Sequence, residues 1–219
     1  MAEKRKLEKK LVESVECIAP NVYVLSFKRD FNFIAGQVVA IDVIDDAQPR
    51  LYSIASGEKD ELVEILFDEQ PKGKLTPKLS KLRKGDTIYV SEPFGTFNSG
   101  GEKAWWIAAG TGIAPFVSMA RSGLGVHKIL IHGGRRDENF YFANYLQKEL
   151  TYSYIRCCSQ QQETINYKGR LTKWLKSQLE LPLDIKYYLC GSADMVVQVR
   201  DILISRDVPF QNIVSETYF

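Results

Sequence analysis

The chain has 219 residues, of which 45% are hydrophobic, and a formal net charge of +2 from 29 basic and 27 acidic side chains. This length allows one large domain or two small ones, each with a proper core. The near balance of charge argues against a general nucleic-acid binder, so an electrostatic partner would have to be met by a local patch.

The first ten residues are basic and are followed by no apolar run, so they lack the hydrophobic core of a signal peptide. A disordered arm is a sufficient interpretation of this decapeptide. No uninterrupted apolar stretch approaches the length of a membrane span, and we therefore expect a cytoplasmic protein that does not bind membranes. Four cysteines have neither zinc nor iron–sulfur spacing, so no metal is expected. They are Cys17, Cys157, Cys158 and Cys190.

From Leu11 to about Gly100 the pattern is that of short strands separated by turn residues. Strands are predicted at 22–27, 38–43, 62–67 and 87–90, with another segment at 50–56 among them. Such spacing is typical of a small antiparallel β-barrel.

The segment 50–56 reads Arg-Leu-Tyr-Ser-Ile-Ala-Ser. Successive side chains of a strand alternate between faces, so Arg50 and Tyr52 should project together. A guanidinium grips phosphate oxygens in a fork, while a phenol can lie against a ring and Ser53 can offer a hydroxyl to a ring nitrogen. The segment predicts a planar ligand that carries phosphate; an ordinary strand with a salt-bridged arginine is the alternative.

A helical insert over residues 73–79 interrupts the strands. Thr76 is expected to be its N-cap and Pro77 its first helical residue. Gly73 would let a ligand approach the backbone, and the helix N-terminus favours an anion, although a capped surface helix explains the pattern too. Six basic residues surround the insert, and they form either a solvated face or a docking patch. They are Lys72, Lys74, Lys78, Lys81, Arg83 and Lys84.

After Gly101 the sequence pattern changes from short strands to alternating strands and helices, which predicts domains at 1–101 and 102–219. Residues 104–109 form a continuous apolar run, as expected of a parallel strand buried on both faces. Gly-Thr-Gly-Ile-Ala-Pro follows at 110–115, and a helical pattern continues over 116–121. A strand, a glycine turn and a helix cradle phosphate, but Pro115 stands where the classical dinucleotide fingerprint has its third glycine.

Strands and helices alternate through the remainder of the chain, which predicts an α/β domain with a parallel sheet. The predicted strands are 128–132, 154–157 and 187–190, and the predicted helices are 138–150, 173–178 and 192–206. Ligands bind beyond the carboxyl ends of such strands, where Arg135, Arg156 and Arg170 stand. Arginine suits a 2′-phosphate. Each could also be a surface charge, and the use of NADH stays open. His132 is expected to be a packing residue.

The motifs at 50–53, 73–76 and 110–115, with Cys-Gly-Ser-Ala-Asp-Met at 190–195, occur in the order found in the ferredoxin:NADP reductases. The chain resembles this family of flavoproteins from about Leu11 to its end. The resemblance implies an N-terminal antiparallel β-barrel that binds FAD and a C-terminal α/β parallel-sheet domain that binds NADPH. Two features depart from the family: Glu92 replaces the first glycine of a Gly-Pro-Phe-Gly turn, and Arg156 lies unusually far from Arg170.

The resemblance implies that Arg50 binds the flavin phosphates, Tyr52 stacks on the isoalloxazine, and Ser53 approaches the ring atom that accepts the hydride. The full set expected at FAD is Arg50, Leu51, Tyr52, Ser53, Phe67, Gly73, Lys74, Leu75, Thr76, Thr111, Tyr218 and Phe219. The set expected at NADP is Gly110, Thr111, Gly112, Arg135, Arg156, Arg170, Cys190, Gly191 and Met195.

The chain ends in Glu-Thr-Tyr-Phe. By resemblance, Tyr218 covers the ring face where nicotinamide binds, and Phe219 lies toward the adenine, which favours FAD over FMN. Ser53, Cys190, Glu216 and Tyr218 are the expected catalytic residues. Cys190 is expected to position the nicotinamide, and Glu216 to relay a proton.

The resemblance thus implies a flavoprotein oxidoreductase that transfers hydride between NADPH and FAD, and single electrons between FAD and ferredoxin or flavodoxin. An acidic carrier would dock at the basic patch. The residues expected there are Lys72, Lys74, Lys78, Lys81 and Lys84. One alternative is a reductase that feeds an oxygenase, free flavin or ferric iron, and another is a flavin-bound regulatory or electron-transfer subunit.

Overall fold

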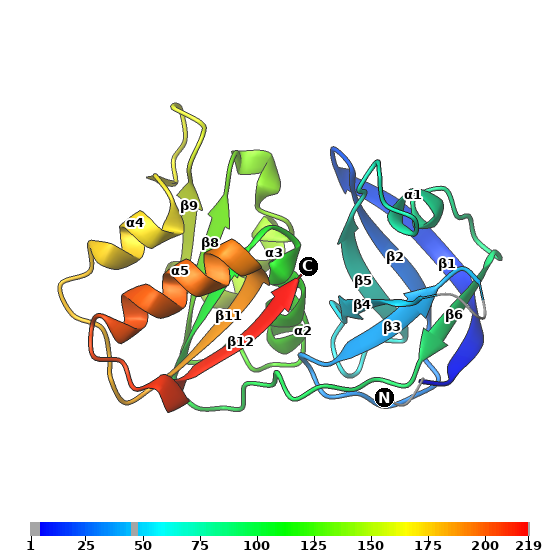
Figure 1. Cartoon of the computed structure of the whole chain (residues 1–219), viewed down its shortest axis with the longest axis horizontal. Helices are drawn as coiled ribbons and strands as arrows, with labels where there is room; N and C mark the ends of the chain where they lie inside the picture. The colour runs from blue at the N-terminus through cyan, green and yellow to red at the C-terminus, as the bar shows by residue number, and fades with distance from the viewer. Residues whose placement is uncertain (1–4, 45–47, 219) are drawn as a thin grey trace. The chain divides into compact units, whose positions relative to one another are not determined.

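The computed structural model describes residues 5–44 and 48–218, and the chain divides into two compact units, residues 1–98 and 99–219 (Figure 1). The boundary expected from the sequence lay slightly later, after residue 101. Each unit contains one six-stranded sheet, antiparallel in the first unit and parallel in the second. The predicted fold class is therefore confirmed. The role expected of Phe219 lies outside the described residues.

The sheet of the first unit closes on itself. Its strand order is β4-β3-β6-β1-β2-β5, and a bridge between Ile54 and Ile65 joins the two outer strands. Next to that bridge, the amide of Ala55 donates to the carbonyl of Glu64 at 2.7 Å. This closure removes the open edges of the sheet, as in a barrel. The strands are β1 (Leu7–Ala19), β2 (Val22–Lys28), β3 (Val38–Asp42), β4 (Arg50–Ser53), β5 (Leu62–Asp68) and β6 (Thr87–Ser91).

The interpretation of the basic N-terminus as a disordered arm was wrong from Leu7 onward. Strand β1 begins there, and Leu7–Leu11 pair antiparallel with residues 91–87 of β6. Lys10 also donates to the carboxylate of Asp30 at 2.5 Å. The charged side chains of this segment do not indicate a strand, because this part of β1 forms through backbone pairing with β6. Strand formation depends strongly on such context.

The short helix α1 (Thr76–Leu79) corrects a second expectation. Leu75, rather than Thr76, occupies the N-cap position, and no side chain caps the helix. The Thr76 hydroxyl instead accepts a hydrogen bond from the amide of Gln70 at 2.9 Å, which closes the loop before the helix. Leu79 is fully buried in the barrel core, so packing holds the helix in place.

The second unit is a parallel sheet in the order β10-β9-β8-β7-β11-β12. The strands are β7 (Ala104–Ala109), β8 (Lys128–Gly134), β9 (Tyr154–Cys158), β10 (Tyr167–Lys168), β11 (Lys186–Ser192) and β12 (Ile213–Tyr218). The helices are α2 (Ala114–Arg121), α3 (Ala143–Leu150), α4 (Leu171–Lys176) and α5 (Ala193–Ile204). Among the residues described, none of these helices combines the length and apolar character needed to cross a bilayer.

Strand β7 is buried on both faces, as its continuous apolar run predicted. Trp105 and Ile107 belong to a core cluster with residues of α4 and α5. Trp106 points to the other face and stacks on Phe116 of α2, with ring centroids 5.5 Å apart. Helices α4 and α5 therefore cover one face of the sheet and α2 covers the other (Figure 1).

The helix predicted over 138–150 begins only at Ala143. Residues Asp137–Asn139 form a single 3-10 turn, in which the Asn139 side chain accepts the amide of Arg136 at 2.9 Å. Phe142 then adopts a left-handed conformation with φ of 57°, which helical residues do not adopt. This turn places Asp137 beside the loop that follows β9.

Candidate functional site

Two glycine motifs interlock at the carboxyl ends of β7 and β11. A Cβ atom on Gly112 would stand 2.4 Å from the carbonyl oxygen of Cys190 and 2.6 Å from the amide nitrogen of Gly191. A Cβ atom on Gly191 would stand 2.6 Å from Cε of Met195 and 3.1 Å from the carbonyl oxygen of Ala109. At Gly112 these neighbours are backbone atoms, and Gly191 has a φ of 154°, so both positions require glycine.

The turn after β7 takes the form of a phosphate-cradling loop. Gly110 has φ of 59°, a left-handed value that lets the chain leave the strand sharply. Residues Gly110–Ile113 form a 3-10 turn, and Pro115 lies in the first turn of α2, where its missing N–H is not needed. Backbone amides at such a turn and helix start converge on an anion. The sequence motif thus has the strand, turn and helix that were predicted.

Strand register gathers three of the four expected catalytic residues. Cys190 pairs with Ala108 of β7 on one side and with Glu216 of β12 on the other. Ser192 pairs with Tyr218 at the end of the same two strands. The Ser192 hydroxyl accepts a hydrogen bond from the amide of Met195 at 3.4 Å and so caps the N-terminus of α5. The carboxyl ends of β11 and β12 therefore place Cys190 and Glu216 side by side next to the glycine cradle, and the Cys190 side chain is fully buried there.

The fourth expected catalytic residue, Ser53, lies in the barrel unit at the end of β4. Its side chain is 2% exposed, whereas Arg50 at the start of the strand is exposed. The Tyr52 ring meets Phe67 edge-on, with centroids 6.3 Å apart. Burial raises the pKa of the Tyr52 phenol, which therefore stays protonated at neutral pH. The strand presents an exposed cation and a half-buried neutral aromatic, and the binding of a planar ligand by this pair stays a prediction.

Phe67 supports the Tyr52 ring from inside the barrel. It is 2% exposed and also stacks on Tyr23, with centroids 5.5 Å apart and an interplanar angle of 18°. Leu51, by contrast, is 57% exposed on β4. Direct contact of either residue with FAD stays a prediction.

The loop before α1 is tight at Gly73. Its amide donates to the carbonyl of Gln70 at 2.7 Å, and a Cβ atom would stand 3.0 Å from that carbonyl oxygen. Lys74 is exposed, whereas the Leu75 side chain is 8% exposed and belongs to the barrel core. Leu75 can therefore offer a ligand its backbone but little side chain, as expected of a loop that binds phosphate through amides.

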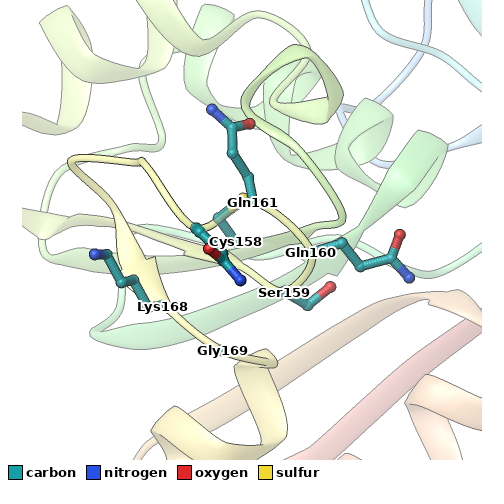
Figure 2. Close-up of a pocket in the computed structure, with 7 residues that line it drawn as sticks. Cys158, Ser159, Gln160, Gln161, Lys168 and Gly169 are labelled. Carbon is teal, nitrogen blue, oxygen red and sulfur yellow. The ribbon is translucent and has the colours of Figure 1, made fainter.

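A cavity of about 480 Å³ opens at the carboxyl ends of β9 and β10. Figure 2 shows its lining, which comes from the end of β9, the loop after it, and the end of β10. The lining residues are Cys158, Ser159, Gln160, Gln161, Gln162, Lys168 and Gly169. The glutamines and Lys168 were not predicted as site residues, although a run of three glutamines between a strand end and Gly169 is a visible signal in the sequence.

The three arginines expected at the 2′-phosphate have different surroundings. Arg135 is exposed directly after β8, and its carbonyl accepts the amide of Gln160 at 2.8 Å. Arg170 is exposed directly after Gly169 of the cavity lining. The Arg156 guanidinium lies against two aromatic rings, 5.9 Å from the centroid of Phe140 and 5.5 Å from that of Tyr154. Arg135 and Arg170 therefore each adjoin a residue that lines the cavity, Gln160 and Gly169 respectively. Arg156 is not among the lining residues.

His132 is a packing residue, as predicted. Its side chain is fully buried, and Nδ1 lies 2.9 Å from the Tyr154 hydroxyl. Burial, helped by the Arg156 charge, lowers the pKa of His132 to about 3. Burial likewise raises the pKa of the Cys157 thiol to about 12. Neither group changes its protonation near neutral pH.

The chain resembles known oxidoreductases in both sequence and fold. Residues 106–201 match the family of oxidoreductase NAD-binding domains, a span that includes the glycine cradle, strand β11 and strand β7 from Trp106 onward. The fold is that of a ferredoxin NADP+ reductase from Neisseria gonorrhoeae solved with FAD and NADP, with a TM-score of 0.89 and 20% identity. That likeness covers 99% of this chain and 100% of the other.

Sequence relatives narrow the class to a family. Ferredoxin–NADP reductase A of Sorangium cellulosum is 30% identical over 206 residues, which cover 80% of this chain and 74% of that protein. The ferredoxin–NADP reductase of Azotobacter vinelandii is 29% identical over 217 residues, 84% of each chain. The toluate 1,2-dioxygenase electron transfer component of Pseudomonas putida is 27% identical, over 94% of this chain and 66% of that one. The chain belongs to the ferredoxin–NADP reductase family.

Proposed function

We propose that the protein transfers hydride between NADPH and FAD, and single electrons between FAD and an acidic carrier, ferredoxin or flavodoxin. The observation that carries this proposal is the glycine cradle, in which Gly112 and Gly191 interlock beside the paired Cys190 and Glu216. A role in electron transfer alone would not need this nucleotide-binding geometry. The relatives from S. cellulosum and A. vinelandii are named for the same reaction.

The residues of the chain fit both groups. FAD would be held by the exposed Arg50, the neutral ring of Tyr52 and the tight loop at Gly73, and it supplies the conversion between hydride and single-electron chemistry. The cradle at Gly112 leaves room for a nucleotide to approach the backbone. In this proposal Cys190 orients the nicotinamide from its strand end, Ser53 hydrogen-bonds the flavin ring, and Glu216 holds or relays a proton.

NADPH is the proposed nucleotide because cationic side chains flank the cavity beyond β9. Lys168 lines it, and Arg135 and Arg170 adjoin it. Anaerobic bleaching of the flavin band should be faster with NADPH than with NADH. The double variant Arg135→Gln/Arg170→Gln should bind NADPH about tenfold to a hundredfold more weakly, because charge-assisted hydrogen bonds to the 2′-phosphate are lost, and should leave NADH unaffected.

The matched control for that experiment is Arg200→Gln, since Arg200 pairs with Asp201 on α5. NADPH should reduce the flavin of the Arg200→Gln variant at the wild-type rate. Equal rates of bleaching by the two nucleotides in the wild type would contradict the preference for NADPH. A yellow protein that neither nucleotide reduces would contradict the proposed function itself.

The proposed carrier docks on the lysines around α1. Lys72, Lys78 and Lys81 are exposed, and an acidic partner is drawn to such a patch. The triple variant Lys72→Glu/Lys78→Glu/Lys81→Glu should slow reduction of a ferredoxin by about tenfold or more at low salt, and the loss should shrink as ionic strength rises. Stopped-flow measurement at several salt concentrations checks this, with Lys59→Glu as the control. A triple variant that reduces ferredoxin at the wild-type rate would exclude docking at this patch.

One observation favours a second acceptor. The P. putida relative, named as the electron transfer component of a dioxygenase, matches 94% of this chain. A reductase that feeds an oxygenase would use the same nucleotide and flavin residues and would differ only in the acceptor. Reduction of an oxygenase ferredoxin in preference to other ferredoxins and flavodoxins would support this alternative.

A further inference from the structure

We infer that Asp137 is a positioning residue of the cavity beyond β9, and that it shapes the cavity to receive the adenosine end of the nicotinamide nucleotide. This inference rests on the proposed function, because that function assigns a nucleotide to this end of the sheet. Asp137 does not line the cavity; it acts through the loop of residues 159–166, which does.

One carboxylate gathers three side chains of this loop. Nε2 of Gln161 donates to Oδ2 of Asp137 at 3.0 Å. The Thr164 hydroxyl and Nδ2 of Asn166 both donate to Oδ1, at 2.7 and 2.8 Å. The Asp137 amide completes the set by donating to Oε1 of Gln161 at 3.0 Å. Hydrogen bonds to an ionised carboxylate are stronger than neutral ones, so Asp137 is the main polar anchor of the loop.

The anchored loop supplies most of the cavity lining. Ser159 through Gln162 come from it, and Lys168 and Gly169 follow it directly. Backbone bonds already fix its first residues, since the amides of Ser159 and Gln160 donate to the carbonyls of Gly134 and Arg135. The segment from Gln161 to Asn166 contains no regular secondary structure and depends on Asp137 instead. Loss of the carboxylate should therefore make one wall of the cavity less ordered. Binding of a ligand would then have to order this wall, which would lower the affinity.

Asparagine replaces Asp137 poorly in this network, because it has one acceptor oxygen in place of two and carries no charge. Nε2 of Gln161 also donates to the carbonyl of Glu163 at 2.9 Å, so both of its protons are in use. In Asp137→Asn, the new amide group can face Nε2 of Gln161, which is a donor, or it can face Thr164 and Asn166, which would then have to reorient to accept it. Turning the Gln161 amide over would break its bond from the Asp137 backbone. The substitution keeps the shape of the side chain, but it removes the charge-assisted hydrogen bonds and requires the remaining partners to reorient.

The test uses the flavin-loaded protein with Asp137→Asn, Thr164→Val and the control Glu138→Gln. Glu138 lies in the same 3-10 turn and is exposed, and its substitution removes the same charge. We expect KM for NADPH to rise about tenfold in Asp137→Asn, with kcat toward excess ferricyanide unchanged. Thr164 does not line the cavity, and valine keeps the shape of its side chain. Thr164→Val removes only one of the three side-chain hydrogen bonds to Asp137, so KM for NADPH should rise less than in Asp137→Asn. Glu138→Gln should match the wild type.

Hydrogen exchange provides a readout that does not depend on turnover. Amides of residues 161–166 should exchange faster in Asp137→Asn than in Glu138→Gln, while those of β8 stay unchanged. An unchanged KM in Asp137→Asn would overturn the inference. So would a parallel loss of kcat, bound flavin and thermal stability, which would indicate general unfolding.

Failure of the proposed function would look different. In that case neither nucleotide would reduce the wild type, and binding of adenosine 2′,5′-bisphosphate measured by calorimetry would decide the inference. Binding that is about tenfold weaker in Asp137→Asn than in Glu138→Gln would support it. Equal binding by the two variants, or no binding by the wild type, would overturn it.

Discussion

Replacing Gly112 by alanine should nearly abolish reduction of the flavin by NADPH while leaving the flavin bound. The new Cβ atom would stand 2.4 Å from the carbonyl oxygen of Cys190, 2.5 Å from its carbonyl carbon and 2.6 Å from the amide nitrogen of Gly191. All three are backbone atoms, so the end of β11 must shift as a whole. Overpacking of this kind costs roughly 1–3 kcal/mol of stability, and a backbone clash belongs at the upper end.

The functional loss should exceed the loss of stability. Cys190 belongs to the strand end that is displaced, and misplacement of reacting groups by about 1 Å can cost about a hundredfold in rate. Anaerobic stopped-flow bleaching of the flavin measures that rate, and a thermal melt measures the stability. Gly101→Ala is the matched control, because nothing lies within 4 Å of a Cβ atom at Gly101. A Gly112→Ala protein that bleaches at the rate of Gly101→Ala would contradict the assigned cradle.

The cradle was predictable because its determinants are local. A continuous apolar run specifies a buried parallel strand, and a glycine pair followed by proline specifies the turn and helix start. What the sequence could not reveal is that Gly112 rests on Gly191, nearly eighty residues later. That contact depends on β7 and β11 being neighbours in the sheet. The same adjacency, extended to β12, brings Glu216 beside Cys190.

Features that depend on competition between partners escaped prediction. Thr76 has the residue type and position of an N-cap, but its hydroxyl bonds to the amide of Gln70, six residues earlier. Asp137 was not singled out, because its partners Gln161, Thr164 and Asn166 are 24 to 29 positions away. Sequence rules weigh propensities within a few residues, whereas these side chains accept hydrogen bonds from donors that only the folded chain brings near.

The flavin site, in contrast, can be tested at a single side chain. Replacing Arg50 by glutamine should weaken FAD binding by about a hundredfold or more, because a guanidinium fork makes two charge-assisted bonds to phosphate and each contributes roughly 1.5–3 kcal/mol. Arg50 is exposed at the start of β4, and its pairing with Ile41 of β3 uses the backbone. The barrel should therefore fold normally, and the protein should be purified with little colour.

Lys59→Gln is the control for Arg50→Gln, since it removes one positive charge from another exposed position of the barrel unit. Titration of each apoprotein with FAD, followed by quenching of flavin fluorescence, gives the two dissociation constants. Excess FAD should restore reduction by NADPH in Arg50→Gln, because Tyr52 and Ser53 keep their places on the strand. Equal affinity in the two variants would remove Arg50 from the phosphate site. Weak affinity without recovery at saturating FAD would mean that Arg50 also orients the flavin ring, a role beyond holding its phosphates.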